Sequence, residues 1–593
     1  MNALTTQLSE LFSAAFAVLG LDPEYGEVVL SNRADLADFQ CNGALPAARD
    51  AGKKPRELAE EIIANLDSEK REAMLAEVGV AGPGFINLRL RDDYLAGHIG
   101  QMAEDERLGV PLPEERHTVV LDFGGANVAK RMHIGHLRPS IIGASLARLF
   151  RFHGDTVISD IHMGDWGTQM GQLIAELERR RPDLPYFDPD YTGPYPAESP
   201  VTMDDLGAIY PAASARFKED KAFAEAARRA TKELQDGRPG YRALWQHFVD
   251  VSIATLKEDF ERLNVEFDLW LGESHAHERI APMVKRLQEE GLAEDSAGAL
   301  IVHIAEPDDK TEIPPMMLLK SDGSVLYGTT DLATIEQRVE ELGADMIFYV
   351  VDVRQSLHFQ QVSRAARRTG IAPADKVVLE HLPNGTINGP DGRPFKTRAG
   401  DVPTLAEVMD MVVEKARERL EELETAQSYD EAERERIAEL VGMAALKFGD
   451  LVNHRSTDYV FDLDRFTSFE GRTGPYLLYA AVRIKSILRR AAERGLEPGE
   501  ILPPAGPQER ELMVKLVQLP DVIEFAVETR APNHIADYVY NLAILFNRFY
   551  REHHILSEPN PARQESWLAL SAYTLAQLEL GLGLLGIEIP ERM

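Results

Sequence analysis

One strand–loop–helix–strand unit constrains the fold more than any other feature of this sequence. A short apolar run over 118–123 predicts a strand, residues 124–135 are rich in turn-forming types, and apolar residues recur at helical spacing over 137–152. A second strand-like run follows at 156–161. Because two strands joined by a helix in this way lie parallel in one sheet, the unit predicts the start of a doubly wound nucleotide-binding fold.

The chain around this unit divides into three predicted domains. Residues 1–113 read as a small mixed domain that ends in a proline-containing linker. Residues 114–404 are predicted to form the Rossmann-like domain, in which the helical and charged stretch 172–260 reads as an insertion. Residues 405–593 are almost wholly helical and predict a helix bundle.

Periodicity and capping residues predict the elements of these domains. Thr404 and Glu407 match a capping box, in which each side chain bonds the other residue's backbone amide at a helix start. That helix is expected to run to about residue 424. Further helices are predicted over 4–19, 55–66, 437–451, 475–494, 509–528 with a break at Pro520, 535–553 and 567–586, and further strands over 84–90, 299–304, 346–351 and 377–379.

The charge balance gives an ambiguous indication of the partner. The 593 residues carry a formal net charge of −33, which taken alone favours a metabolic enzyme over a protein that binds RNA phosphates. An acidic chain can still bind RNA through local basic strips, although each strip is also typical of a solvated helix face. The basic clusters are Lys53, Lys54 and Arg56; Arg364, Arg367 and Arg368; and Arg483, Lys485, Arg489 and Arg490.

Cysteine usage and hydropathy indicate the compartment. Cys41 is the only cysteine, so neither an internal disulfide nor a cysteine-based zinc cluster is expected. His162, His275 and His277 lack companions at metal-ligand spacing, and no protein-bound metal is predicted. The amino terminus has no basic leader, and no stretch offers about 18 uninterrupted apolar residues. We therefore expect a cytoplasmic protein without a membrane partner.

The most informative motif lies in the loop between the first strand and its helix. A helix amino terminus exposes unpaired amides and a partial positive charge, which suits phosphates. His133 and His136 are one turn apart and can add donors for a reacting phosphate, while Gly135 allows close backbone approach. The alternative is that both histidines only cap the helix. Because the chain has no P-loop pattern, this loop is the predicted ATP phosphate site.

The residues around this loop carry a resemblance to a known family. The stretch ANVAKRMHIGHLRPSIIG resembles the first signature of class I aminoacyl-tRNA synthetases, and its Ala-Asn-Val-Ala-Lys start is similar to the form in arginyl-tRNA synthetases. The likeness extends over essentially the whole chain. The other matching segments are HMGDWGTQMG at 162–171, VLYGTTDLA at 325–333, DVRQSLHFQQ at 352–361, DGRPFKTRAG at 391–400, GRTGPYLLYAAVRI at 471–484 and the terminal LLGIEIPERM.

The resemblance implies a fold and a reaction. The fold is multidomain, α/β plus all-α: a Rossmann-like class I catalytic domain with a helical insertion, a small α+β N-terminal domain that contacts tRNA, and a C-terminal helix bundle that binds the anticodon. The implied ligase reaction joins arginine to ATP, supplied with Mg²⁺, as arginyl-adenylate and then transfers arginine to the 3′ end of arginine tRNA. Positioning and charge stabilisation dominate such a reaction. A monomer is expected.

The resemblance also implies roles for individual residues. A guanidinium is planar and rich in donors, so a carboxylate can grip it bidentately while an aromatic ring flanks it. The alternative for Tyr327 and Asp331 is a strand-end aromatic and a helix N-cap. The implied residues are Asn127, Tyr327, Asp331 and Gln355 for arginine; His133, Gly135, His136, Gly164 and Asp165 for ATP; Lys130, Lys396 and Arg398 beside the two histidines for catalysis; and Tyr476, Tyr479 and Arg483 for tRNA.

Two segments depart from the usual class I pattern. The second signature, commonly Lys-Met-Ser-Lys, reads Phe395-Lys396-Thr397-Arg398, a change that many arginine enzymes share. In those enzymes a lysine just before the histidine motif looks like a substitute, and Lys130 stands in that place. The loop before the first signature, commonly Ser-Ala-Pro-Asn, has glycine at its first two positions, Gly124 and Gly125.

Two other functions remain open from sequence alone. One is a class I synthetase for another amino acid, although the cysteine enzyme needs zinc ligands that are missing and a glutamate pocket would want arginine where Asp331 stands. The other is a non-catalytic paralogue that only binds tRNA. In the bundle, Tyr476 and Tyr479 could stack on a base, but core packing of Tyr476 explains the pattern equally well.

Overall fold

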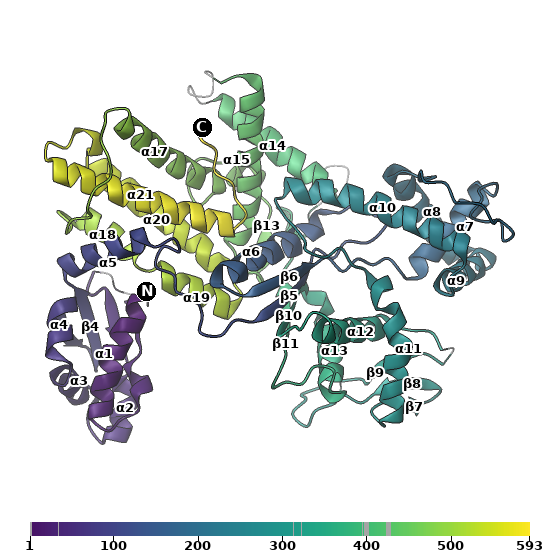
Figure 1. The fold of residues 1–593 in the computed structure, drawn as a ribbon, viewed down its shortest axis with the longest axis horizontal. Coiled ribbons are helices and arrows are strands. Elements are labelled where there is room, and N and C mark those ends of the chain that lie inside the picture. The colour runs from purple at the N-terminus through teal and green to yellow at the C-terminus, as the bar shows by residue number, and fades with distance from the viewer. Residues whose placement is uncertain are drawn as a thin grey trace.

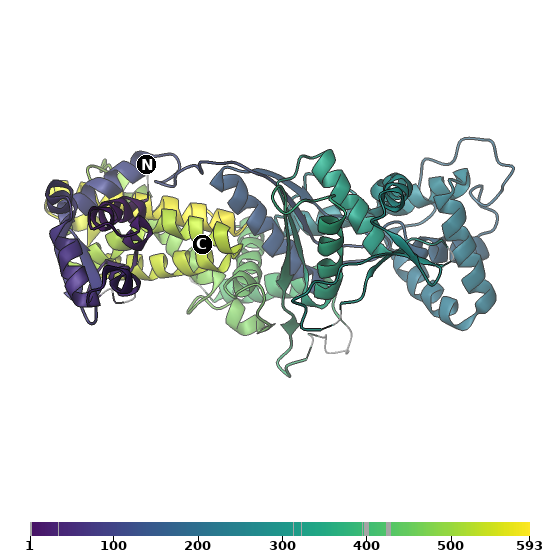
Figure 2. The same ribbon diagram turned by 90° about the horizontal axis from the view of Figure 1, so that it is seen from below.

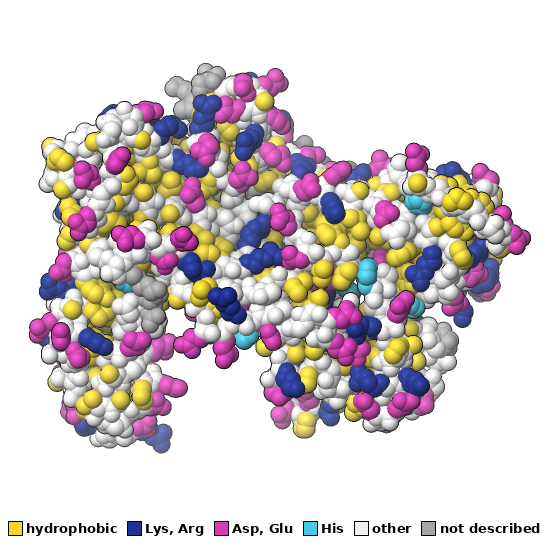
Figure 3. All heavy atoms as spheres, viewed as in Figure 1, with side chains coloured by type: hydrophobic (Ala, Val, Ile, Leu, Met, Phe, Trp, Pro, Cys, Tyr) yellow, Lys and Arg dark blue, Asp and Glu magenta, His cyan; other side chains and the backbone are white. Residues whose placement is uncertain are grey.

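The computed structural model describes residues 3–31, 33, 35–311, 313–321, 323–393, 395, 402–422 and 429–593. Figure 1 shows an N-terminal domain, a central α/β domain and a C-terminal helical bundle. Figure 2 shows the insertion helices at one end of the elongated molecule, with the N-terminal domain and the bundle at the other end. On the face seen in Figure 3, acidic and basic side chains are interspersed, so the net negative charge is not gathered in one patch there.

The N-terminal domain is built on an antiparallel sheet in the order β1-β2-β4-β3. Its strand β4 (Phe85–Leu90) confirms the predicted strand, and the helices α1 (Leu4–Val18) and α3 (Pro55–Ala64) confirm the first two predicted helices. The other elements are β1 (Val28–Leu30), β2 (Phe39–Cys41), α2 (Ala44–Ala51), α4 (Ser68–Met74), β3 (Leu75–Ala81) and α5 (Asp92–Glu104).

The central sheet contains four parallel strands in the order β11-β10-β5-β6. Alternate residues of β5 (Thr118–Phe123) face opposite ways, so Leu121 and Phe123 join the core against α6 (Leu137–His153), while Val120 joins the core on the opposite face. Both faces are therefore covered, as a parallel sheet requires. The other strands are β6 (Thr156–Asp160), β10 (Met346–Asp352) and β11 (Val378–Asn384), which confirm the predicted strands.

The predicted insertion is helical, as expected. It contains α7 (Thr168–Arg180), α8 (Met203–Glu219), α9 (Lys221–Gln235) and α10 (Pro239–Arg262). The chain then forms α11 (Glu273–Glu289) and a small antiparallel sheet of β7 (Glu294–Ser296), β8 (Ala299–Val302) and β9 (Met316–Leu319), of which the sequence predicted only β8. Helices α12 (Tyr327–Glu340) and α13 (Ser356–Arg368) return the chain to the central sheet.

The carboxyl-terminal part is helical throughout its long elements. Thr404 caps α14 and exchanges hydrogen bonds with Glu407, which confirms the predicted capping box. The break expected at Pro520 falls at Val517 and Gln518, because Pro520 sits in the first turn of the next helix, where its missing amide costs nothing. The helices are α14 (Leu405–Glu421), α15 (Glu431–Leu451), α16 (Leu463–Phe466), α17 (Gly474–Ala492), α18 (Pro507–Leu516), α19 (Leu519–Thr529), α20 (Asn533–Glu552) and α21 (Pro561–Leu584).

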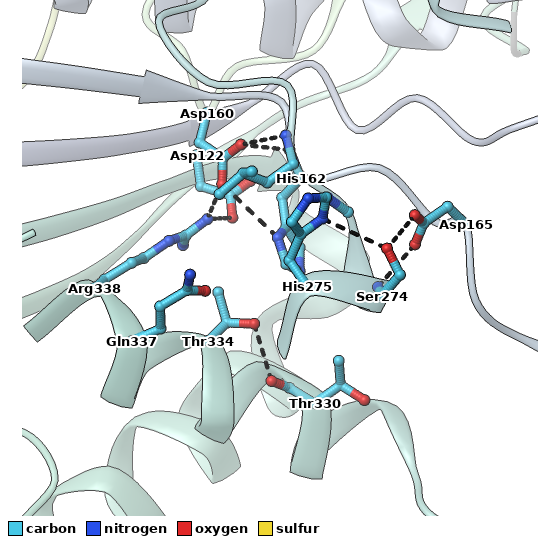
Figure 4. Close-up of polar contacts among 12 residues, drawn as sticks. Asp122, Asp160, His162, Asp165, Ser274, His275, Thr330, Thr334, Gln337 and Arg338 are labelled. Carbon is cyan, nitrogen blue, oxygen red and sulfur yellow. Dashed lines mark hydrogen bonds and ion pairs between the residues drawn. The ribbon is translucent and has the colours of Figure 1, made fainter. Parts of the chain in front are cut away.

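A buried ion-pair cluster fixes α12 against the carboxyl edge of the central sheet. The Arg338 side chain, 2% exposed, donates one hydrogen bond of 2.7 Å to Asp122 and another of 2.9 Å to Asp160 (Figure 4). These two carboxylates stand opposite each other at the ends of β5 and β6. The guanidinium also lies 5.4 Å from the centroid of the Tyr349 ring on β10. One side chain thus joins a helix to three neighbouring strands.

We expect Arg338→Ala to lower the free energy of unfolding of the catalytic domain by about 3 to 5 kcal/mol, because it leaves two buried carboxylates without their partner. Arg354→Ala is the matched control. Arg354 also pairs with an aspartate, Asp352, but its side chain is 81% exposed, so the expected loss is about 0 to 1 kcal/mol. Urea unfolding of both variants measures the difference. Equal losses of unfolding free energy would contradict the stabilising role of the buried ion-pair cluster.

Candidate active site at the carboxyl edge of the parallel sheet

The loop after β5 leaves the sheet through two glycines in a left-handed conformation. Gly124 has φ +93° and Gly125 has φ +60°, values that favour glycine. A Cβ atom on Gly124 would also lie 3.1 Å from the Phe267 ring. The departure from the usual Ser-Ala-Pro-Asn pattern therefore has a local structural reason in this chain.

Asn127 lies where this loop meets the segment after β6. Its backbone forms a parallel bridge with Gly164, and the Val128 amide donates to the Gly164 carbonyl at 3.1 Å. A Cβ atom on Gly164 would lie 2.3 Å from the Asn127 side-chain oxygen, so any larger residue would displace that amide. The structure thus brings together two residues that the sequence placed in the arginine site and the ATP site.

His133 and His136 form a paired cap before α6. The Gly135 amide donates to His133 Nδ1 at 3.0 Å, and the His133 amide donates to His136 Nδ1 at 3.0 Å. The capping alternative is therefore present in the structure, but it does not exclude phosphate binding. Because Nδ1 of His133 accepts a hydrogen bond from the Gly135 amide, the neutral ring is assigned its proton on Nε2, which can act as a donor.

Burial makes both rings poor bases. It lowers the pKa of His136 to about 4, with a further contribution from His133, and it lowers the pKa of His133, with further contributions from Lys130 and Arg354. Both imidazoles are therefore neutral near pH 7 in the free protein. The permanent positive charge next to the pair comes from Lys130, which follows Ala129 at φ +66°. Lys396 and Arg398 lie outside the described residues.

The segment after β6 forms another side of the candidate site. Asp165 is buried, and its carboxylate accepts hydrogen bonds from the Ser274 amide at 2.9 Å and from the Ser274 hydroxyl at 2.6 Å (Figure 4). Burial raises the pKa of Asp165 despite these bonds. Asp165, which the sequence predicted to bind ATP, is therefore a buried residue that links the segment after β6 to α11. His162, before it, has a φ of +41°; its buried ring nitrogens form no hydrogen bond with the described residues, and Nδ1 lies 3.8 Å from an Asp160 carboxylate oxygen.

An acidic cluster lies where α11 and α12 begin. Tyr327 begins α12 with 64% of its surface exposed, and Asp331 follows one turn later on the same face. The N-cap of α12 is Leu326, so the alternative that Asp331 is an N-cap is wrong. Glu273, the first residue of α11, has its pKa raised to about 8 by burial and by the nearby carboxylates of Asp331 and Asp165.

His358 is the partner of Asp331 in the free protein. Its Nε2 forms a hydrogen bond with the Asp331 carboxylate, which raises the pKa of His358. Gln355, the residue that the sequence singled out in the same segment, is exposed in the short helix η3 (Val353–Gln355), and the contact with Asp331 comes from His358 instead. His358 lay within the quoted DVRQSLHFQQ segment, whereas the sequence around Glu273 held no comparable signal.

The predicted tRNA residues gather on α17. Tyr476 is half-buried and its hydroxyl accepts a 2.9 Å hydrogen bond from Asn547, which also accepts one of 2.7 Å from Arg483. The Arg483 guanidinium lies 4.7 Å from the centroid of the Tyr479 ring, and Tyr479 is 41% exposed. Tyr479 and Arg483 therefore form a ring and charge at the surface, while Tyr476 is held by polar contacts as well as by packing.

Comparison with known proteins assigns these features to a family. Three family models match: "Arginyl tRNA synthetase N terminal domain" at residues 2–90, "tRNA synthetases class I (R), catalytic domain" at 98–463 and "DALR anticodon binding domain" at 477–593. The chain is a member of the arginyl-tRNA synthetase family. The catalytic-domain match at 98–463 covers both the histidine loop and the acidic cluster.

Individual relatives of this synthetase agree over its whole length. It is 49% identical to "Arginine--tRNA ligase" from Alkaliphilus oremlandii and 50% identical to the protein of the same name from Maricaulis maris, with complete coverage of both chains in each pair. Its fold is similar to that of the arginyl-tRNA synthetase from Plasmodium falciparum, with a TM-score of 0.82, 22% identity and complete coverage of both chains.

Within the described part of the chain, no group of three or more histidines, cysteines and carboxylates is arranged to hold a metal ion. None of the described helices combines the length and apolar character needed to cross a bilayer.

The two raised pKa values predict that arginine binds more tightly as pH rises. A guanidinium needs Glu273 ionised, and it competes with protonated His358 for Asp331, so both groups must lose a proton. Below about pH 8 each added pH unit should lower the dissociation constant for arginine by up to about tenfold through Glu273, and this effect should level off above about pH 8; the loss of the His358 proton adds to the fall.

Direct binding measurements by calorimetry would check this pH dependence. Glu273→Gln is the control, because it removes one titrating group and leaves the ionisation of arginine itself unchanged. The slope should flatten in this variant; an unchanged slope would refute the assignment to Glu273.

Proposed function

We propose that this chain is an arginine–tRNA ligase that first converts arginine and Mg·ATP to arginyl-adenylate and pyrophosphate, and then transfers arginine to the 3′ end of arginine tRNA. The observation that carries the proposal is the acidic cluster of Glu273 and Asp331, which shares the carboxyl edge of the parallel sheet with the histidine loop. Ligands of doubly wound folds bind at this edge.

The acidic cluster has the chemistry to select arginine. The guanidinium lies between the carboxylates of Asp331 and Glu273, and the exposed Tyr327 ring flanks its plane. A neutral side chain of similar length would leave the Asp331 carboxylate paired with His358 alone. Glu273 is largely protonated at pH 7 in the free protein and ionises when the guanidinium arrives, because a nearby positive charge favours the carboxylate form.

The histidine loop holds the nucleotide. Neutral His133 donates from Nε2 to phosphate oxygens, and Lys130 supplies the positive charge near the leaving pyrophosphate. Mg²⁺, which arrives with ATP, neutralises further phosphate charge. The arginine carboxylate then attacks the α-phosphorus, the bond to the bridging oxygen of pyrophosphate breaks, and Asn127 holds the amino-acid end of the substrate between the two walls.

The remaining parts of the chain serve the tRNA. The bundle offers Tyr479 for stacking and Arg483 for a phosphate, and the N-terminal domain contacts the body of the tRNA. We further infer that the protein works as a monomer in the cytoplasm, where its single buried cysteine stays reduced.

Arginine-dependent exchange of pyrophosphate into ATP, with and without arginine tRNA, tests the proposal together with tRNA charging. We expect charging, and we expect exchange only when tRNA is present, as the family resemblance implies. A protein that never charges tRNA would be the non-catalytic paralogue instead. Robust exchange without tRNA would refute the tRNA requirement alone.

Asp331→Asn should abolish efficient arginine use while ATP binding and the fold persist. The amide keeps the size of the carboxylate but lacks its charge and its second acceptor oxygen. The dissociation constant for arginine should rise about 30-fold to several thousandfold, which corresponds to about 2 to 5 kcal/mol. Glu340→Gln is the control, since Glu340 is an exposed residue of the same helix. A collapsed thermal midpoint in Asp331→Asn would show a structural role instead.

Lys130→Ala should lower the rate of adenylate formation much more than it weakens arginine binding. The broad Arg398 guanidinium replaces a compact ammonium poorly, so the loss should be on the order of a few hundredfold. Arg131→Ala serves as the control, because Arg131 is the adjacent cation and points to Asp204. Single-turnover kinetics measure this rate. An unchanged rate of adenylate formation in Lys130→Ala would mean that Lys396 or Arg398 already supplies the positive charge.

A further inference from the structure

Helix α8 of the insertion contacts the histidine loop through two ionic side chains. The Lys130 ammonium lies 4.5 Å from the centroid of the Tyr210 ring, and Arg131 donates a 2.6 Å hydrogen bond to Asp204. Both partners belong to α8, which begins after a capping box formed by Thr202 and Asp205. The insertion therefore meets the active-site loop at the residue that carries its permanent charge.

The contact with Tyr210 is part of a continuous packed interface. Val128 and Ala129, the two residues before Lys130, are buried in the same apolar cluster as Leu206 and Ile209 of α8. The Ala129 amide also donates a 2.9 Å hydrogen bond to the hydroxyl of Ser252 on α10. Loop and insertion thus share one packed core, and the Tyr210 ring packs against it beside Lys130.

An aromatic ring beside a lysine restricts the positions that its ammonium group occupies. The lysine side chain has four rotatable bonds, and ordering it costs conformational free energy. An aromatic face attracts the ammonium and restricts it to one region. The ring holds the ammonium in the loop that carries the histidine pair, and the charge of Lys130 contributes to the lowered pKa of both His133 and His136.

Tyr210 also acts electrostatically on Tyr327. It contributes to the raised pKa of Tyr327, after burial and Glu273. Tyr210 itself is half-buried, and Pro211 follows it inside α8.

We propose that Tyr210 is a positioning residue for adenylate formation: its ring holds the Lys130 ammonium over the pyrophosphate end of the nucleotide site, so that the insertion completes the catalytic centre. The inference rests on the proposed role of Lys130 and extends it to a residue of the insertion. Tyr210 acts through Lys130 and not by touching the reacting atoms.

Tyr210→Leu tests the role of the ring. The variant should lower kcat for adenylate formation, in the presence of tRNA, about three- to thirtyfold, the range expected for one cation–π contact. KM for arginine should change less than about threefold. Tyr210→Phe keeps the ring and should retain a rate near that of the unchanged protein. Tyr191→Leu is the matched control, because Tyr191 lies in the same insertion and contacts Pro194 and Tyr195 there.

A double-mutant cycle separates positioning from support of the fold. In a Lys130→Ala background, Tyr210→Leu should cause no further loss of kcat, because the side chain through which it acts is gone. A structural effect would lower the rate by the same factor in both backgrounds, and the thermal midpoint would fall with it. Equal losses in the two backgrounds, or a Phe variant as slow as the Leu variant, would overturn the proposal.

The same measurements distinguish a failure of the proposed function from a failure of the inference about Tyr210. If the unchanged protein shows no arginine-dependent exchange with tRNA present, the proposed function fails. If Lys130→Ala turns over normally, the role of Lys130 fails and the inference falls with it. If Lys130→Ala is slow but Tyr210→Leu is as fast as the unchanged protein, the inference alone is refuted.

Discussion

Arg338 carries a buried guanidinium that lies between carboxylates of two adjacent strands. Asp122 is the penultimate residue of β5 and lies opposite Asp160, the last residue of β6, and without a cation two buried carboxylates at this spacing would repel each other. Asp160 also accepts hydrogen bonds from the amides of His162 and Leu271, so the ion-pair cluster is connected to the segment that contains Asp165. Because Arg338 belongs to α12, the same contact sets where Asp331 stands relative to the nucleotide loop.

The sequence predicted those elements whose hydrophobic pattern is strong and local. The strand–loop–helix–strand unit at 118–161, the insertion helices and the bundle all have apolar residues at regular spacing, and the structure confirms them. Elements without such a pattern were missed. β1 and β2 are three residues long, and every residue of β7 is exposed, so their pairing depends on distant partners that periodicity does not reveal.

The site divides in the same way. His133, His136 and Lys130 share one loop, so their proximity follows from the sequence alone. Glu273 and His358 become neighbours of Asp331 only because three separate segments meet at the edge of the sheet. The likeness to known synthetases predicted that Asp331 binds arginine, yet only the structure identifies Glu273 and His358 as its titratable neighbours. The protonation of these two neighbours determines the net charge of the acidic cluster, and the sequence motifs did not predict it.

The free site keeps much of its charge neutralised until substrates arrive. The two histidines are neutral, Glu273 is largely protonated at pH 7 and Asp331 is paired with His358, so buried groups avoid the cost of uncompensated charge. In the proposed reaction, arginine brings the cation that ionises Glu273. ATP then brings phosphate charge opposite Lys130, whose ammonium lies against the Tyr210 ring. The proposed site would discriminate through charge, because a neutral amino acid supplies no cation to favour the ionised form of Glu273 or to replace His358 at Asp331.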